Sequence, residues 1–203
     1  VYLKQFNKNN LKQFIEIEGL NFLKEIKKNN EQVIFISGHF NNFELMAMEI
    51  QKAGINLCAI YRPLNNKFLN PIMEYIRKNY ICNNQVKKGV SGTKQLLKHF
   101  KNNTSIALMI DQRVSQGIKS NFFNEPAYTT TIPAQFVKKF NAKVVPIYIE
   151  RSKDNKFNLE IYEPLIFNKK YSVQQITDEL NQLLEKMVLK NPDQWIWTHN
   201  RWK

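Results

Sequence analysis

The stretch VIFISGHFNNFELMAMEI, residues 33–50, decides how the fold of this chain is interpreted. Its first part is a short apolar run typical of a buried strand, and its last part has the composition of a helix. The polar turn between them holds His39 and Glu44. α/β proteins often place catalytic groups at such strand-to-helix turns. We therefore interpret this stretch as one β–α unit with a candidate site at its turn.

The spacing of His39 and Glu44 suits two side chains that meet at a turn. On one continuous helix, five positions would rotate them away from each other. With His39 in the loop and Glu44 in the first helical turn, we expect the carboxylate to reach an imidazole nitrogen. Such a pair can act as a general base, in which Glu44 fixes the tautomer and His39 takes a proton from a substrate hydroxyl. A single histidine at a strand end is also often only structural, so the spacing alone leaves both interpretations open.

Strand and helix patterns alternate outward from this unit. The expected strands span residues 32–37, 56–61, 81–86, 105–110, 143–149 and 157–163. The expected helices span residues 10–28, 42–53, 67–79, 92–101, 132–140 and 172–190. A long polar loop is expected at 111–130, and the last two strands are expected to pair antiparallel. The order predicts an α/β fold, a mixed, mainly parallel central sheet with helices on both faces, in a single domain over residues 1–203.

Two further strand ends carry polar side chains. Arg62 follows strand 56–61 and is fixed by Pro63, which suits a phosphate or carboxylate ligand, although an exposed loop arginine is an equal alternative. Asp111 and Gln112 follow strand 105–110. Asp111 could orient Arg62, bind a substrate hydroxyl or only cap the loop. Because ligands bind at the carboxyl ends of parallel strands, we expect these residues and His39 to share one site.

The composition limits the classes of function. Thirty Lys and Arg residues against 17 Asp and Glu give a net charge of +13, which attracts nucleic acid, anionic lipid, phosphorylated substrates or an acidic carrier protein. The two cysteines lack the spacing of a disulfide framework or a zinc site, and Cys58 is expected in the core. Neither a phosphate loop nor a serine-hydrolase elbow is present, and we expect no metal site. No apolar run is long enough to span a membrane. The Trp-rich segment 194–202 could pack on the core, the more common outcome, or lie at a membrane surface.

Six blocks of sequence, in order, carry a resemblance to a known family. They are GHFNNFE (38–44), YRPLNN (61–66), MIDQ (109–112), FFNEPAYTTT (122–131), AKVVP (142–146) and PDQWIWTHNRWK (192–203). Together they resemble the bacterial lipid A biosynthesis acyltransferases, the late lauroyl and myristoyl transferases. Asn41 and Asn124 stand where that family usually has glycine. Asparagine tolerates left-handed backbone conformations better than most residues, so the turns stay plausible.

The resemblance implies a glycerolphosphate-acyltransferase-like fold. It implies transfer of a fatty acyl group from acyl carrier protein to a hydroxyl of a lipid A precursor. In that reaction we expect His39 and Glu44 to be catalytic and Arg62, Asp111 and Gln112 to bind substrate, with Arg62 on a phosphate. No cofactor or metal is expected, because a thioester is already activated. Backbone N–H groups in the turn after His39 are the candidate oxyanion donors.

The expected partners are acyl carrier protein, a lipid A precursor or another glycolipid acceptor, and the membrane surface, with no nucleic acid. The expected location is the cytoplasmic face of the bacterial inner membrane. The family usually carries an N-terminal hydrophobic anchor before this region, and we expect the present chain, which begins at Val1, to be a fragment lacking it.

Three alternatives to this function stay open. A related enzyme acting on another glycolipid or a lysophospholipid would keep the same fold and base. A basic nucleic-acid-binding protein would explain the charge but not His39, Glu44 and the ordered blocks. A catalytically dead, membrane-associated relative is disfavoured by the intact pair.

Overall fold

Seven strands form the central sheet, in the order β1-β9-β8-β2-β5-β3-β4. The structure, a computed structural model, describes residues 3–202, so Val1, Tyr2 and Lys203 lie outside it. The strands are β1 (Ile15–Glu18), β2 (Val33–Ser37), β3 (Leu57–Tyr61), β4 (Asn84–Lys87), β5 (Ser105–Met109), β8 (Lys143–Arg151) and β9 (Phe157–Ile161). Every neighbouring pair is parallel except β8 and β9. The predicted mixed, mainly parallel sheet and its late antiparallel pair are confirmed.

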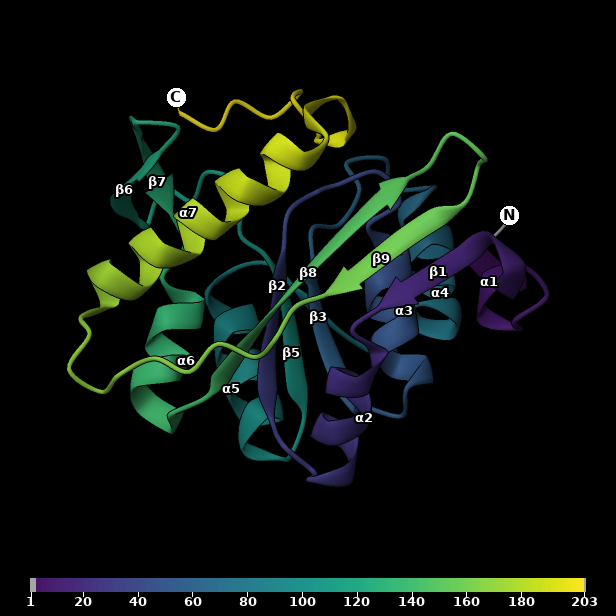
Figure 1. Cartoon of the computed structure of the whole chain (residues 1–203), viewed down its shortest axis with the longest axis horizontal. Coiled ribbons are helices and arrows are strands. Elements are labelled where there is room, and N and C mark those ends of the chain that lie inside the picture. The colour runs from purple at the N-terminus through teal and green to yellow at the C-terminus, as the bar shows by residue number, and fades with distance from the viewer. Residues whose placement is uncertain (1–2, 203) are drawn as a thin grey trace.

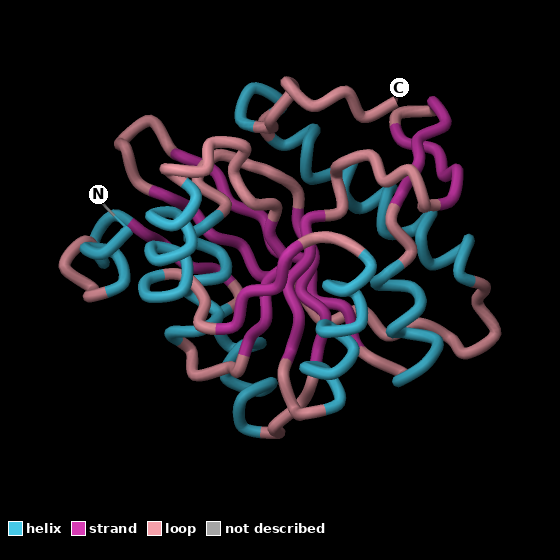
Figure 2. Tube along the Cα trace, turned by 180° about the vertical axis from the view of Figure 1, so that it is seen from behind, coloured by secondary structure: helices cyan, strands magenta, loops and turns pink. Residues whose placement is uncertain are grey.

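Helices cover both faces of this sheet (Figures 1 and 2). They are α1 (Leu3–Asn7), α2 (Leu20–Lys28), α3 (Glu44–Lys52), α4 (Asn70–Tyr80), α5 (Val90–Lys101), α6 (Ile132–Phe140) and α7 (Val173–Lys190), with short 3₁₀ turns at Lys12–Phe14 and Pro192–Gln194. Parallel crossovers are right-handed, so the chain's change of direction after β4 moves α5 and α6 to the face opposite α2, α3 and α4. Figure 1 shows these two groups on opposite sides of the central strands.

The change of direction creates a crevice between β2 and β5. These strands are neighbours, but the chain leaves β2 through α3 on one face and returns from β5 through α6 on the other. In open α/β sheets, such a switch point is where ligands bind, beyond the carboxyl ends of the strands. β2 is buried at every position because strands and helices surround it, so it gives the crevice a rigid floor.

The segment 10–28 is not one helix as predicted. Residues 15–18 form β1, which pairs with β9, and only Leu20–Lys28 is the helix α2. The sequence there is Ile-Glu-Ile-Glu, a strand-like alternation that the surrounding helical pattern obscured. Gly19 separates the two elements at a φ of +74°, and a Cβ there would lie 2.0 Å from the carbonyl oxygen of Ile161. Only glycine allows this close approach of β1 to β9.

The predicted polar loop 111–130 contains a hairpin. Strands β6 (Ile118–Phe122) and β7 (Glu125–Thr129) pair antiparallel across a two-residue turn. Both turn residues, Phe123 and Asn124, have positive φ, as the turns that suit hairpins require. Asn41 also has a positive φ. Asparagine therefore fills left-handed positions at both places where the resembling family usually has glycine.

The remaining predictions differ from the structure mainly at element ends. Helix 132–140 and all six expected strands appear within a few residues of their predicted bounds. Cys58 lies in the core as expected, and burial raises the pKa of its thiol to about 12. The Trp-rich segment packs on the protein, with Trp195 buried, although Trp197 is exposed. Within residues 3–202, no helix combines the length and apolarity needed to cross a bilayer.

Candidate active site

The register of the two central strands brings His39 and Asp111 together. Ser37 of β2 pairs with Met109 of β5. His39 is two positions after Ser37 and Asp111 is two positions after Met109, so the two residues lie at the same level beyond the sheet. The Ile110 N–H donates to the Ser37 carbonyl and extends the pairing toward the site. The His39 Nδ1 atom lies 2.7 Å from Asp111 Oδ1. The strand ends therefore form an imidazole–carboxylate pair at the crevice.

Asp111 is a buried carboxylate with all its contacts directed at the site. Its Oδ2 accepts from the His39 backbone N–H at 2.7 Å and from the Trp195 indole N–H at 2.9 Å. The residue is only 3% exposed. Burial disfavours the charged form, but the hydrogen bonds and charge of His39 and the indole N–H outweigh it, so the Asp111 pKa lies below its usual range. An ionised Asp111 holds the Nδ1 proton of His39 and leaves Nε2 as the basic nitrogen.

The predicted contact between Glu44 and His39 is corrected by the structure. The Glu44 carboxylate instead pairs with Arg77 of α4, with N–O distances of 2.8 and 2.9 Å. The physical reason is that Glu44 begins α3, which lies on the same face as α4, while Asp111 already occupies Nδ1. Glu44 and Arg77 both line the cavity that His39 borders. A catalytic role for Glu44 stays a prediction. In this structure such a role would act through Arg77, because Glu44 does not contact the imidazole.

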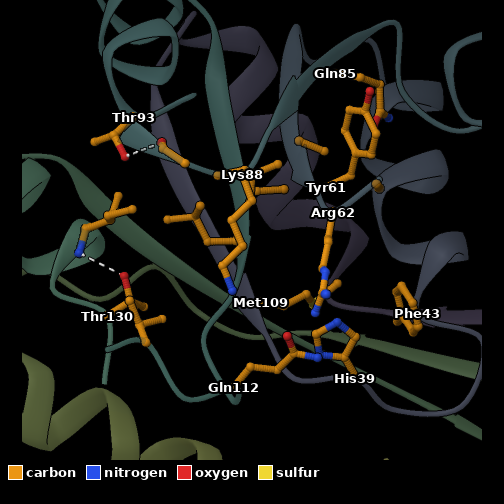
Figure 3. A pocket seen from close by; sticks show the side chains of 18 of the residues that line it. His39, Phe43, Tyr61, Arg62, Gln85, Lys88, Thr93, Met109, Gln112 and Thr130 are labelled. Carbon is orange, nitrogen blue, oxygen red and sulfur yellow. Dashed lines mark hydrogen bonds between the residues drawn. The ribbon is translucent and has the colours of Figure 1, made fainter. Parts of the chain in front are cut away.

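The cavity has a volume of about 660 Å³ and opens beside the imidazole. The His39 ring packs edge-on against Phe43, with ring centroids 4.9 Å apart, and its side chain is 19% exposed. In the described part of the chain, no residue hydrogen-bonds to His39 Nε2. Figure 3 shows the guanidinium of Arg62 and the amide of Gln112 directed toward the His39 end of the cavity. A base, a cation and an amide therefore converge on one space.

Positive charge surrounds the cavity mouth. Arg62, Lys88 and Lys94 line it and are exposed. Among the described residues, none forms an ion pair with these three side chains, whereas Arg77 is neutralised by Glu44. Figure 3 shows the Lys88 side chain reaching into the cavity. Such a site attracts phosphate or carboxylate groups.

A second part of the cavity wall is apolar and built from small side chains. Ala59 of β3 and Ala107 of β5 are partners in register, so they lie side by side on one face of the sheet. Ala47 of α3 and Ile81 also line the cavity. Alanines leave open the volume that larger side chains would fill, so the wall can accept a flexible apolar chain.

Of the predicted substrate contacts, Arg62 and Gln112 line the cavity and Asp111 does not. The carboxylate of Asp111 is instead buried behind the imidazole, because the end of β5 is covered by the C-terminal segment. The expected oxyanion donors are also engaged elsewhere. The three amides after His39 donate to the Gly38 carbonyl, the Gln194 carbonyl and the Asn41 side chain.

The C-terminal segment completes the site, which the sequence did not predict. Besides the Trp195 bond to Asp111, His199 Nε2 accepts from the Arg113 N–H at 3.0 Å. Burial, with the nearby positive charges, lowers the His199 pKa, so its neutral form is favoured. Arg201 is fully buried, and its guanidinium donates to the Tyr128 carbonyl and the Thr129 hydroxyl of the hairpin. The run of Trp, His and Arg residues in this segment was the available signal.

Arg201 has no carboxylate partner among the described residues. Burial lowers the pKa of Arg201 to about 10, although the negative charge of Asp111 acts in the opposite direction and raises it. Its ring contact is with Phe122, whose centroid lies 5.2 Å from the guanidinium carbon. The segment is therefore fixed to the hairpin by hydrogen bonds and stacking. Over residues 3–202, no group of three His, Cys, Asp or Glu side chains is arranged to hold a metal ion.

Comparisons of the sequence point to one family. The profile of the family described as bacterial lipid A biosynthesis acyltransferase matches residues 1–203. The chain is 27% identical over 198 residues to a lipid A biosynthesis acyltransferase of Haemophilus influenzae, covering 95% of the chain and 62% of that protein. It is 22% identical over 201 residues to the lipid A biosynthesis palmitoleoyltransferase of Escherichia coli, covering 95% and 63%. The chain thus spans less than two thirds of the length of these relatives.

The fold has a counterpart of known structure. The 1-acyl-sn-glycerophosphate acyltransferase of Thermotoga maritima superposes with a TM-score of 0.56, over 96% of this chain and 80% of that one. Sequence identity is 13%, so the likeness concerns the fold. It confirms the expected glycerolphosphate-acyltransferase-like architecture.

Proposed function

Because the chain belongs to the bacterial lipid A biosynthesis acyltransferase family, we propose that it transfers a fatty acyl group from acyl carrier protein to a hydroxyl of a lipid A precursor. The observation that carries the proposal is the imidazole of His39, which lines a cavity of about 660 Å³ while its Nδ1 is held by the buried Asp111 and its Nε2 has no hydrogen-bond partner among the described residues. That arrangement is a general base at the edge of a space that admits a substrate.

The reaction needs one proton transfer to begin. His39 Nε2 takes the proton of the acceptor hydroxyl, and the oxygen attacks the carbonyl carbon of the acyl thioester. The new ester forms as the carbon–sulfur bond breaks, and the imidazolium returns the proton to the leaving thiolate. Asp111 stabilises the imidazolium in between, because its lowered pKa keeps it ionised. No further reactant is required, since the thioester is already activated.

Residues around the base supply binding and charge stabilisation. The Gln112 amide, directed toward the His39 end of the cavity, donates to the oxygen that becomes negative. Arg62 binds a phosphate of the acceptor or of the phosphopantetheine arm. Lys88 and Lys94 extend the same positive field. The apolar wall with Ala59 and Ala107 receives the acyl chain.

The charge of the chain supports the partners of this reaction. A net charge of +13 favours an acidic carrier protein, an anionic membrane surface and a phosphorylated lipid acceptor. We place the enzyme at the cytoplasmic face of the bacterial inner membrane, held at its surface or by a segment outside this chain.

The test is acyl transfer from radiolabelled lauroyl- and myristoyl-acyl carrier protein to a purified lipid A precursor. His39→Ala should lose activity about 10²- to 10⁴-fold. His99→Ala is the matched control, because His99 lies on α5 and does not line the cavity. Near-normal transfer by His39→Ala would refute the mechanism. Transfer only to another glycolipid or to a lysophospholipid, offered in parallel, would keep the mechanism and change the acceptor.

A further inference from the structure

Helix α4 shows its apolar side chains to the outside. None of its residues is buried, and it lies at the edge of the molecule with α1 and α3 (Figure 1). Phe68 and Leu69, just before the helix, are 89% and 51% exposed, and Ile72 and Tyr75 are 56% and 60% exposed. Scattered apolar residues are normal on protein surfaces, but four large ones within eight positions form a patch.

The spacing of the patch places it on one side of the helix. Ile72 and Tyr75 are three positions apart on α4, so they are neighbours on one face, and Phe68 and Leu69 lie in the turn that leads into the helix. The face that is turned inward carries Glu74 and Arg77 together with the half-buried Met73 and Ile76. Glu74 accepts from the Tyr61 hydroxyl at 2.8 Å, and Arg77 pairs with Glu44. The helix is thus held to the protein partly by polar contacts and leaves the apolar side chains of its outer face free.

Positive charge borders this patch. Residues 62–88 contain six Lys and Arg residues and a single acidic one, Glu74. The carboxylate of Glu74 is already engaged by Tyr61, Asn70 and Lys87. Lys67 and Lys78 are exposed beside the apolar side chains. An apolar face with basic residues around it fits a surface that is apolar inside and negatively charged outside.

The strand end and the helix on either side of the patch also supply residues to the cavity. Tyr61, Arg62 and Arg77, which belong to the same strand end and helix, line the cavity. A bilayer bound at the patch would therefore lie close to residues of the cavity wall. Ile166 and Leu189 are also exposed, but the segments that carry them, the loop after β9 and helix α7, contribute no residue to the cavity.

We propose that α4 and the loop before it, the surface formed by Phe68, Leu69, Ile72 and Tyr75, dock on an anionic lipid bilayer and aim the cavity at it. Lys67 and Lys78 contact the headgroups, and the four apolar side chains enter the region between headgroups and acyl chains. The inference rests on the proposed function only in taking the acceptor to be a lipid. A carrier-protein docking surface would need the basic residues but not an 89% exposed phenylalanine.

The test is co-sedimentation of the chain with phosphatidylcholine vesicles that contain or lack phosphatidylglycerol. The wild type should bind the anionic vesicles more tightly and lose binding as salt is raised. Phe68→Gln with Ile72→Gln should weaken binding about tenfold or more. The matched control, Ile166→Gln with Leu189→Gln, replaces side chains of similar size and exposure and should bind like the wild type.

Four results would overturn the proposal: no binding by the wild type, equal binding by the α4 variant, equal loss in the control variant, or a wild-type dimer that the α4 variant separates. A raised KM for the carrier protein without a change in vesicle binding would assign the surface to the acyl donor instead. Acyl transfer to detergent-dispersed acceptor, measured on the same proteins, separates the two proposals. This transfer does not depend on vesicle binding. If the wild type showed no such transfer, the acyltransferase function would be refuted.

Discussion

One carboxylate contacts the imidazole of His39 from behind and another lines the cavity, and the two differ in burial and in partner. Asp111, at the end of a buried strand, is 3% exposed and, within residues 3–202, accepts hydrogen bonds from His39 and Trp195 alone. Glu44, at the start of a helix, has a side chain that is 20% exposed and pairs with Arg77. Glu44 is five positions from His39 in the sequence, and Asp111 is 72 positions away. The partner of the histidine is thus chosen by strand register rather than by sequence distance.

The largest effect should follow Asp111→Asn. The asparagine side chain can donate to Nδ1, which places the proton on Nε2 and removes the basic lone pair from the cavity. We expect kcat to fall about 10²- to 10⁴-fold with little change in KM for the donor. Thermal unfolding of the purified variant checks that it is folded. An active Asp111→Asn together with an inactive Glu44→Gln would contradict the assignment of Asp111, rather than Glu44, as the partner of His39.

Ala59→Leu should change the choice of acyl donor without changing the base. Asp111→Asn should slow transfer from every donor equally, whereas a larger side chain in the apolar wall should slow transfer from donors with long acyl chains most. We expect the preference between myristoyl and lauroyl donors to shift about 10-fold or more toward the shorter one. Competition between the two labelled donors measures the shift. An equal loss with both donors would mean that the acyl chain lies elsewhere.

Glu44→Gln should cost about tenfold in kcat/KM, because it frees Arg77 rather than disturbing the base. A double-mutant cycle sharpens this comparison. Glu44→Gln and Arg77→Gln should show a coupling of about 0.5–3 kcal/mol, while Glu44→Gln and Asp111→Asn should be nearly additive. Strong coupling between the two carboxylates would mean that they act as one unit on His39.

Asp111 should also make the stability of the protein depend on pH. The Asp111 pKa is lowered in the folded state, so its contribution is present above the unfolded pKa of about 4 and is lost as pH falls through the folded value. At about pH 7 we expect Asp111→Asn to unfold about 1–3 kcal/mol more easily than the wild type. Urea unfolding over a pH series should show this gap closing in acid. A gap that is constant with pH would contradict the assignment.

The smallest effect concerns His199 in the segment that covers Asp111. Its pKa is lowered by burial, so its contribution is present above about pH 6.5 and is lost as pH falls through the folded value. Protonated His199 cannot accept the Arg113 N–H. Tryptophan fluorescence of the wild type should therefore change in mild acid, and His199→Gln, which keeps an acceptor without titrating, should not. The same change in both proteins would exclude His199 as its source.

Much of the sheet could be predicted from the sequence because its strands are buried and bounded by clear turns. The strand at 33–37 and the helix at 132–140 are of this kind. The edge strand at 15–18 could not, because four alternating residues beside helical patterns carry a weak signal. The hairpin at 118–129 was missed because its residues are polar and its turn is Phe-Asn rather than the usual Asn-Gly.

The candidate site was predicted in its members more than in its contacts. His39, Arg62 and Gln112 stand at one sheet edge because parallel strands end there together. Which carboxylate reaches the imidazole depends on the register of β2 with β5 and on the direction in which α3 leaves its turn. Neither the register nor the direction of α3 can be predicted from the residues near His39. The link from Trp195 to Asp111 joins residues 84 positions apart and was equally out of reach.

The bond from Trp195 to Asp111 has a consequence for the order in which the protein is made. His39 and Asp111 are synthesised before the indole of Trp195, which completes the contacts of the carboxylate, and before Arg201, which fixes the segment to the hairpin. A nascent chain that still lacks these residues has an uncovered β5 end and an under-stabilised carboxylate. The imidazole–carboxylate pair therefore lacks its full set of contacts until residue 195 has been synthesised, and a chain cut short before that residue has no indole to donate to Asp111.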